Sequence, residues 1–313
     1  MTIKSLYVGI ALLVWPAAFC FSAVQISEMV EIGGIRQYIE IRGLGEQSPL
    51  LLFFHGGPGN SVTKRASAFT SELQKHFLVV LWDQRNSGQT RELNAPSHQL
   101  NLALMESDAL ELIQYLLKRF KQPKLFLFGH SWGGFLALRV AASHPELVKA
   151  CMAVSPMIYQ EQSERESLAW MLDKARSSKN AKAITELEQV NVPFENADHL
   201  YWHRYWLARF SGNRPPDREF VKRWSAEWLA LLNEASRVNL MAGLADWQVP
   251  LFLFIGGRDY QTHYNLAREF FTHVKARKKD LFWFPNSGHN LLFSDSRKVQ
   301  EQVISILNDQ EIQ

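Results

Sequence analysis

The segment Gly129-His130-Ser131-Trp132-Gly133 decides the fold prediction, and it fits the pattern G-x-S-x-G. The apolar run from Lys124 to Phe128 precedes it and predicts a buried strand, while the small, apolar run from Phe135 to Ala142 predicts a helix packed tightly on a sheet. Glycines on both sides of Ser131 let the chain turn sharply, so that the serine hydroxyl is displayed at the end of the strand. The N-terminus of the following helix favours negative charge at that point.

A second glycine-rich turn, His55-Gly56-Gly57-Pro58-Gly59, directly follows another apolar run, Leu50 to Phe54. Its backbone N–H groups are free to point at a substrate oxygen. We expect the N–H of Gly56, or that of Gly57, to join the N–H of Trp132 in an oxyanion hole. In isolation the turn would be a simple connection between a strand and a helix. Its position two strands ahead of the Ser131 turn favours the catalytic interpretation.

Two further loops supply an acid and a base. Asp259 follows a strand predicted over Leu251 to Ile255, and His289 follows one predicted over Leu281 to Phe284. The chain order Ser131, Asp259, His289 predicts a catalytic triad in an α/β-hydrolase fold. His289 would take the serine proton and pass it to the leaving group, and Asp259 would orient the imidazole and stabilise its charged form.

Competing acids and bases are less well placed. His263 and His273 fall on the helix predicted after Asp259, where no strand end presents them. Asp246 and Asp295 do not follow a strand end either. These four residues therefore leave the triad assignment unchanged.

From about residue 28 the chain alternates strand-like and helix-like segments, which predicts a mostly parallel central sheet with helices on both faces. A hairpin turned at Gly33-Gly34 opens this pattern. Further strands are expected over 77–82 and 150–154, and helices over 102–120 and 298–307. The two parts of the α/β-hydrolase core are predicted to be residues 24–157 and 246–313.

Residues 158–245 differ from both parts of the core. They are charged and helix-forming, they contain no apolar run typical of a buried strand, and they carry clustered tryptophans at 202, 206, 224 and 228. We therefore predict a helical cap inserted after the sixth strand. Its aromatic side chains either pack the cap helices together or line a substrate pocket, with Trp202 and Trp206 as the candidates for substrate contact.

The composition is that of a soluble globular protein, with 47% hydrophobic and 21% charged residues. A formal net charge of +3, evenly spread, excludes nucleic acid as the expected partner. The sequence contains no phosphate-binding glycine loop, cysteine pair or histidine cluster, so we expect no cofactor and no metal. The expected partner is a small-molecule or short peptide substrate.

Residues 1–23 have the layout of a secretory signal peptide: Lys4, an apolar run from Leu6 to Phe21, and small residues around two candidate cleavage sites. We expect an exported protein, periplasmic or secreted. The alternative is a membrane anchor formed by an uncleaved signal segment. Cys20 would leave with the signal, so Cys151, inside an apolar strand, is expected to be an unpaired core residue.

A loop from Asp83 to Thr90 follows another predicted strand, and Asp83 and Arg85 are expected to form a structural ion pair that braces the glycine turn. Together with His55 to Gly59 and Gly129 to Gly134, this loop resembles the proline iminopeptidase family of α/β-hydrolases. In that family an H-G-G-P-G turn, a D-Q-R-G-x-G-x-S loop and a G-x-S-W-G elbow occur in this order. The resemblance implies a cofactor-free serine hydrolase that uses the triad and oxyanion positions named above.

The cap departs from that family's pattern. Those peptidases hold the free amino group of the substrate with cap glutamates, one of them directly after a W-x-x-W pair. The corresponding aromatic cluster here, Trp202 to Leu207, contains no acid. The other cap acids that remain as replacements are Glu195, Asp198, Glu227 and Glu234.

Three functions therefore stay open. An aminopeptidase that releases an N-terminal residue is favoured by the resemblance. A carboxylesterase acting on small or hydrophobic acyl esters is favoured by the missing acid and the aromatic cap. A non-catalytic binding protein on the same scaffold is the third, although such a protein would be expected to have lost its nucleophile, acid or base.

Overall fold

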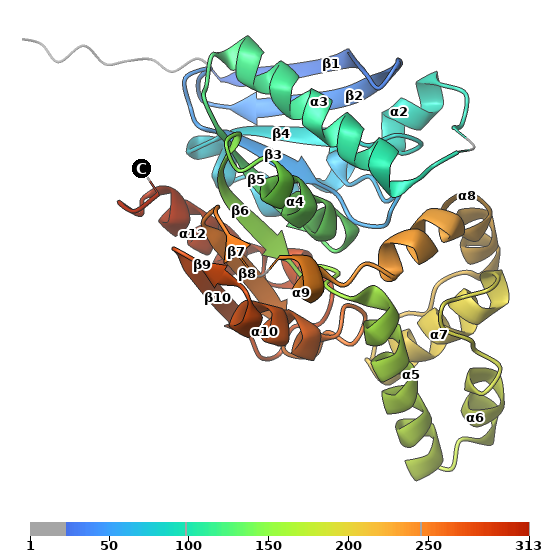
Figure 1. Ribbon diagram of the computed structural model, residues 1–313. Coiled ribbons are helices and arrows are strands. Elements are labelled where there is room, and N and C mark those ends of the chain that lie inside the picture. The colour runs from blue at the N-terminus through green and yellow to red at the C-terminus, as the bar shows by residue number, and fades with distance from the viewer. Residues whose placement is uncertain (1–22, 98, 245, 313) are drawn as a thin grey trace, which may run out of the picture.

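The computed structural model describes residues 23–97, 99–244 and 246–312. The predicted signal segment, apart from its last residue, lies outside these ranges. An eight-stranded sheet with the order β1-β2-β4-β3-β5-β6-β8-β10 forms the centre of the molecule (Figure 1). Its strands are β1 (Val24–Ile32), β2 (Ile35–Gly43), β3 (Leu50–Phe54), β4 (Leu78–Asp83), β5 (Leu125–His130), β6 (Val148–Val154), β8 (Leu251–Gly256) and β10 (Lys279–Phe284).

The sheet is antiparallel only at its first edge. β1 pairs with β2, and β2 with β4, in antiparallel register, whereas every later pair is parallel. The hairpin predicted at Gly33-Gly34 joins β1 to β2, and both glycines have the positive φ that such a turn requires. The prediction of an α/β-hydrolase fold with a mostly parallel sheet is confirmed.

Helices cover both faces of the sheet, so the side chains on both sides of a central strand are buried. A central strand such as β3 is therefore apolar along its whole length. In β3, Leu50, Leu52 and Phe54 belong to one core cluster, and Leu51 and Phe53 belong to the other. The first cluster includes residues of α3 (Leu102–Phe120), α4 (Trp132–Ser143) and α10 (Tyr264–His273). The second includes residues of α1 (Ser67–Thr70), α11 (Leu291–Ser294) and α12 (Ser296–Leu307).

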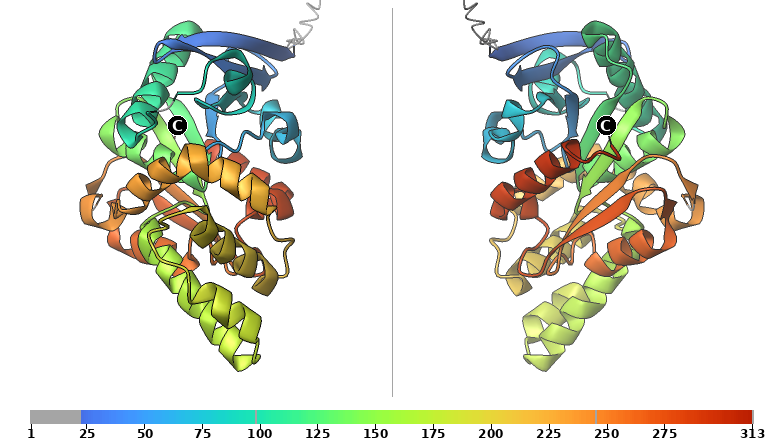
Figure 2. Two further views of the ribbon diagram at one scale, coloured as in Figure 1. Left: turned by 90° about the vertical axis from the view of Figure 1, so that its right-hand side faces the viewer. Right: turned by 90° about the vertical axis from the view of Figure 1, so that its left-hand side faces the viewer.

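Five helices lie between β6 and the return to the sheet. They are α5 (Gln160–Ser177), α6 (Ala181–Leu187), α7 (Ala197–Phe210), α8 (Arg218–Ser236) and α9 (Leu240–Gly243). Both views of Figure 2 show the yellow-green helices of this segment projecting from one end of the molecule. Part of it has an apolar cluster of its own, around Met171, Leu187 and Trp206. The smaller remaining elements are η1 (Thr63–Arg65), η2 (Leu73–Lys75), α2 (Gly88–Leu93), β7 (Asp246–Trp247) and β9 (Lys275–Ala276).

No helix within the described ranges is both long enough and apolar enough to span a bilayer. Cys151 lies fully buried in β6, as predicted, and has no disulfide partner among the described residues; burial raises the pKa of its thiol.

The predicted ion pair between Asp83 and Arg85 is wrong. Asp83 accepts hydrogen bonds from the hydroxyls of Ser61 and Thr63, the latter at 2.6 Å. Arg85 instead makes a two-pronged contact with Asp108 of α3, with Nε–Oδ2 and Nη2–Oδ1 distances of 2.8 Å and 2.9 Å. The Asp108 side chain is completely buried. The pair therefore braces α3 against the loop, and its acid comes from a helix distant in sequence.

Replacing Arg85 with leucine should lower the free energy of unfolding by roughly 3–5 kcal/mol, because it leaves the buried Asp108 carboxylate without its counter-charge. Urea unfolding would measure this. The matched control is Lys75→Leu, which removes one partner of the exposed Lys75–Glu72 pair and should cost less than about 1 kcal/mol. Similar losses in the two variants would contradict the assignment.

Candidate active site

Ser131, His289 and Asp259 form one hydrogen-bonded row at the carboxyl edge of the sheet. His289 Nε2 lies 3.0 Å from Ser131 Oγ, and His289 Nδ1 lies 3.0 Å from Asp259 Oδ2. Ser131 follows β5, Asp259 follows β8 and His289 follows β10. Because parallel strands end at the same edge, three loops far apart in sequence meet here.

Ser131 occupies a sharp turn between β5 and α4. Its φ of 57° and ψ of −120° are unusual for a residue with a side chain. A Cβ on Gly129 would lie 2.2 Å from the Gly133 oxygen, and one on Gly133 would lie 2.0 Å from the Phe54 oxygen. A side chain at either position would collide with backbone atoms, which cannot move aside as a flexible side chain can. Both positions therefore require glycine.

The glycine turn after β3 lies beside the serine. A Cβ on Gly56 would be 3.3 Å from the Ser131 Cβ, and Gly57, with a φ of 121°, lines the same cavity as Ser131. Trp132 is the first residue of α4, so its N–H is among those without an acceptor inside the helix. Of the three predicted oxyanion-hole residues, Trp132 directly follows Ser131 in the chain and Gly56 lies beside its side chain, whereas Gly57 shares the cavity with it.

Gln84, which the sequence did not single out, joins this turn to the serine turn. Its Nε2 donates to the His55 carbonyl at 3.1 Å, and its Oε1 accepts from Trp132 Nε1 at 3.0 Å. The His55 ring contacts the Gly56 carbonyl through Nδ1, and burial lowers its pKa. Nε2 of the neutral His55 ring accepts a hydrogen bond from the backbone N–H of Gln84. The only sequence signal for Gln84 was its place directly after a buried strand.

Asp259 is held as a carboxylate. Burial by itself raises its pKa, but the charge and hydrogen bond of His289 and the Thr262 N–H outweigh burial and lower the pKa below its ordinary value. The N–H groups of Gln261 and Thr262 donate to Oδ1 at 2.9 Å and 3.1 Å, and the Thr262 hydroxyl lies 2.9 Å from Oδ2. An ionised, fully bonded Asp259 can fix the tautomer of His289.

His130, beside the serine, holds the loop that carries His289. Its Nε2–H donates to the His289 carbonyl at 2.9 Å, and the two ring centroids are 5.0 Å apart. Burial, with the neighbouring His289, lowers the pKa of His130 to about 4. His130 therefore stays neutral near neutral pH and places no second positive charge beside the base.

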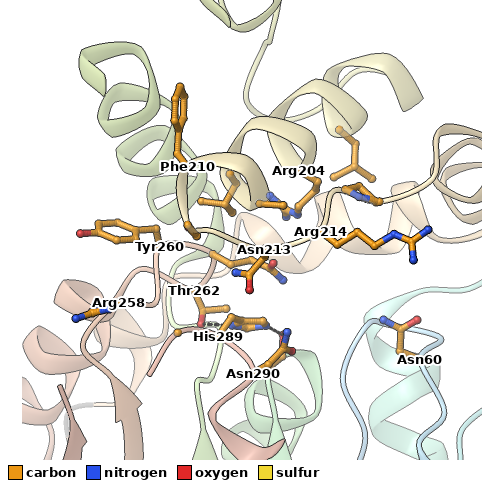
Figure 3. A pocket seen from close by; sticks show the side chains of 18 of the residues that line it. Asn60, Arg204, Phe210, Asn213, Arg214, Arg258, Tyr260, Thr262, His289 and Asn290 are labelled. Carbon is orange, nitrogen blue, oxygen red and sulfur yellow. Dashed lines mark hydrogen bonds between the residues drawn. The ribbon is translucent and has the colours of Figure 1, made fainter. Parts of the chain in front are cut away.

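A cavity of about 960 Å³ lies over Ser131 and His289, between the core and the inserted helices (Figure 3). From α7 it is lined by Leu200, Arg204, Leu207 and Ala208, whose spacing is that of one helix face, and by Phe210 at the end of the helix. Trp170 of α5 and Trp224 of α8 also line it.

Trp202 and Trp206 are absent from the cavity wall, so the expectation that they contact substrate is corrected. They lie on another face of α7. Trp206 donates to Glu186 at 2.8 Å and packs in the apolar cluster of the inserted helices, and Trp202 lies against the Arg218 guanidinium. The tryptophans at the cavity are held by the core instead. Trp170 stacks on Tyr260 with centroids 3.9 Å apart, and Trp224 donates to the Pro58 carbonyl at 2.9 Å.

None of the four replacement acids reaches the cavity. They contact other groups: Glu195 accepts from Asn191, Asp198 pairs with Arg218, Glu227 with Arg91, and Glu234 accepts the Leu102 N–H. No aspartate or glutamate is among the described residues that line the cavity. Nearby Glu164 is buried and paired with Arg204, whose Nη1 lies 2.6 Å from its Oε2.

The profile of the alpha/beta hydrolase fold family matches residues 49–296. The chain belongs to this family. "Probable aminopeptidase YbaC" of Bacillus subtilis (strain 168) is 28% identical over 292 residues, which cover 85% of this chain and 91% of that protein. A proline iminopeptidase of Thermoplasma volcanium is 23% identical over 281 residues, with coverage of 85% and 91%.

Among solved structures, a proline iminopeptidase-related protein from Thermus thermophilus matches with a TM-score of 0.62 and 20% identity. The match covers 91% of this chain and 98% of that one, and it supports the fold. The family match and the peptidase-named relatives identify the chain as a hydrolase similar to the proline iminopeptidases. In the part of this hydrolase that the structure describes, no cluster of three or more His, Cys, Asp or Glu residues could hold a metal ion.

Gly133→Ala should abolish accumulation of folded hydrolase, because the added methyl group would collide with the Phe54 backbone in the centre of the sheet. The yield of soluble protein and its near-ultraviolet circular dichroism would measure this. Gly243→Ala is the control, since a Cβ there meets nothing within 4 Å. Normal folding of the Gly133 variant would show that the turn can relax.

Acid should destabilise the hydrolase between pH 6.5 and pH 4. Burial is the main cause that lowers the pKa of both His130 and His203 from 6.5 to about 4. The unfolded chain therefore binds more protons in this window, and each histidine should remove about 2 kcal/mol of unfolding free energy at pH 5 relative to pH 7.

Urea unfolding at both pH values tests this expectation. His203→Asn should reduce the difference between the two pH values by about 2 kcal/mol, the share of one histidine. The same change at exposed His273 should leave that difference as it is. If the two variants respond to pH identically, His203 does not stay neutral in the folded protein.

Proposed function

We propose that this serine hydrolase works through an acyl-enzyme formed on Ser131, with His289 as general base and then general acid. Asp259 orients His289 and stabilises its charged form. The observation that carries the proposal is the continuous row from Asp259 to His289 to Ser131, with both hydrogen bonds at 3.0 Å. Ser131 and His289 line the cavity, where a substrate carbonyl can reach the serine.

The reaction has two balanced halves. His289 Nε2 takes the Ser131 proton as Oγ attacks the carbonyl carbon, and the N–H of Trp132 with that of Gly56 or Gly57 stabilises the oxyanion. The intermediate then expels the amine or alcohol, which receives the proton from His289. A water molecule attacks the acyl-serine in the same way, releasing the acid and restoring the hydroxyl.

The first substrate class we propose is a peptide or amide from which an N-terminal residue is released. Relatives named as aminopeptidase and proline iminopeptidase, matched over 85% of the chain, support this. The order of the three motifs, from the His55 turn to the Ser131 elbow, supports it as well.

The second substrate class is a carboxylic ester. It is favoured by the cavity wall, whose described residues include no carboxylate to pair with the ammonium group of a peptide. Burying an unpaired ammonium group is costly, whereas an uncharged ester needs no such partner. A purely binding role has less support, because nucleophile, base and acid are all present and bonded to one another.

Hydrolysis of proline p-nitroanilide and of p-nitrophenyl butyrate tests the proposal. Ser131→Ala should abolish turnover, and Asp259→Asn should lower kcat by about 10⁴-fold because the imidazole loses its orienting charge. Asp246→Asn, an exposed acid outside the row, is the control. Cleavage of the amide would establish the aminopeptidase and cleavage of the ester alone the esterase. Full turnover by Ser131→Ala would refute the mechanism.

A further inference from the structure

We infer that the substrate of this hydrolase carries a carboxylate, held by cationic side chains of the cavity wall that have no acidic partner. The inference rests on the proposed function, because it concerns the cavity over Ser131, and it narrows the substrate class. It concerns binding and leaves the chemical steps unchanged.

The charge of the wall is one-sided. Four basic side chains line the cavity, Lys174, Arg204, Arg214 and Arg258, and the described lining residues include no acid. The whole chain has 34 basic and 31 acidic residues, so composition does not account for this imbalance. The charge that each of the four basic side chains offers to a ligand depends on its own partners.

Arg204 contributes no net charge. Its guanidinium makes a two-pronged contact with buried Glu164, with one N–O distance of 2.6 Å. His203 beside it is neutral, because burial lowers its pKa to about 4. Arg204 thus offers only its remaining N–H groups to a ligand.

Arg214 is the opposite case. It lies exposed on the loop between α7 and α8, and no described carboxylate lies within ion-pair distance of it. Figure 3 shows its side chain extending from the cap loop toward the side of the cavity where Asn60 lies. Its full charge is available to a ligand in the cavity.

Arg258 and Lys174 have only neutral partners among the described residues. Arg258 Nη2 donates to Asn286 Oδ1 at 3.1 Å. Lys174 Nζ lies 3.4 Å from the Phe210 carbonyl and 4.7 Å from the centre of the Trp170 ring. These contacts orient the two cations without cancelling their charge.

Three uncompensated cations in the wall, all of them exposed, give the cavity a positive potential. A planar guanidinium matches both oxygens of a carboxylate, while an ammonium group would be repelled. The amides of Asn213 and Asn290 face the same space in Figure 3 and can donate further hydrogen bonds. The carboxylate can belong to the acyl part of the substrate or to its leaving group.

Two matched substrate pairs test both sources. Mono-p-nitrophenyl adipate and p-nitrophenyl hexanoate differ only by a carboxylate at the end of the acyl chain. In the second pair, 3-carboxy-4-nitrophenyl butyrate and p-nitrophenyl butyrate differ by a carboxylate on the leaving group. We expect kcat/KM to favour the charged member of one pair by about tenfold. The preference should shrink as ionic strength rises from about 0.05 to about 0.5 M.

Arg214→Gln should remove most of that preference, because it lowers kcat/KM for the charged member of the pair. Arg209→Gln is the matched control, because Arg209 is an exposed arginine near the end of α7 and lies outside the cavity wall. Equal rates for charged and neutral members in both pairs, or equal effects of the two variants, would overturn the inference.

A binding measurement keeps this result separate from the chemistry. Calorimetry with the Ser131→Ala protein compares adipamate with hexanamide, which differ by the same carboxylate. Tighter binding of adipamate that is lost in Ser131→Ala/Arg214→Gln supports the site even where no ester or amide is cleaved. Equal binding of the two, together with Ser131-dependent turnover that shows no charge preference, refutes the carboxylate site and leaves the proposed function intact.

Discussion

The positive φ of Ser131 is the constraint on which the site depends. A side chain in that conformation costs of order 1–3 kcal/mol, so the surrounding structure must enforce it. Here the Ser131 N–H donates to the Val154 carbonyl at 2.9 Å, and the Phe135 N–H donates back to the Ser131 carbonyl at 3.0 Å. The serine side chain consequently leaves the sheet at its edge, where the loops after β8 and β10 can meet it.

The position of the glycine turn after β3 depends on both parts of the molecule. From the core, Gln84 joins the His55 carbonyl to the Trp132 ring. From the inserted helices, Trp224 bonds the Pro58 carbonyl, and the Trp228 ring lies so close to Gly59 that a Cβ there would meet it at 2.5 Å. Helix α8 therefore packs directly against the turn beside Ser131.

Chemistry and selectivity are divided between the two parts. The core supplies the bonded row of Asp259, His289 and Ser131, which any acyl transfer can use. The inserted helices and the loops opposite them supply the basic side chains of the cavity wall. A buried acid such as Glu164 cannot bind a ligand's ammonium group while Arg204 occupies both of its oxygens.

Local sequence was sufficient for the elements and for the row. Leu50–Phe54 and Leu102–Phe120 could be recognised to the residue, since apolar runs and helical periodicity are properties of a few neighbouring positions. Ser131, Asp259 and His289 could be chosen because parallel strands end at one edge, so a residue that follows a strand is already placed. Gln84 also follows a strand directly, but no neighbouring residue indicated that its side chain would join the two turns, and the bond from His130 to the His289 carbonyl had no local signal.

Only the tertiary structure decided which groups that lie far apart in sequence form pairs. Arg85 contacts Asp108 and not its neighbour Asp83, and the cavity-facing side of α7 carries Arg204 and not Trp202 or Trp206. The charge of the cavity wall is likewise a sum over loops and helices from 174 to 258 in the chain. Local patterns fix which residues share a face. Whether that face meets solvent, a core or a cavity depends on packing between segments that no short stretch of sequence contains.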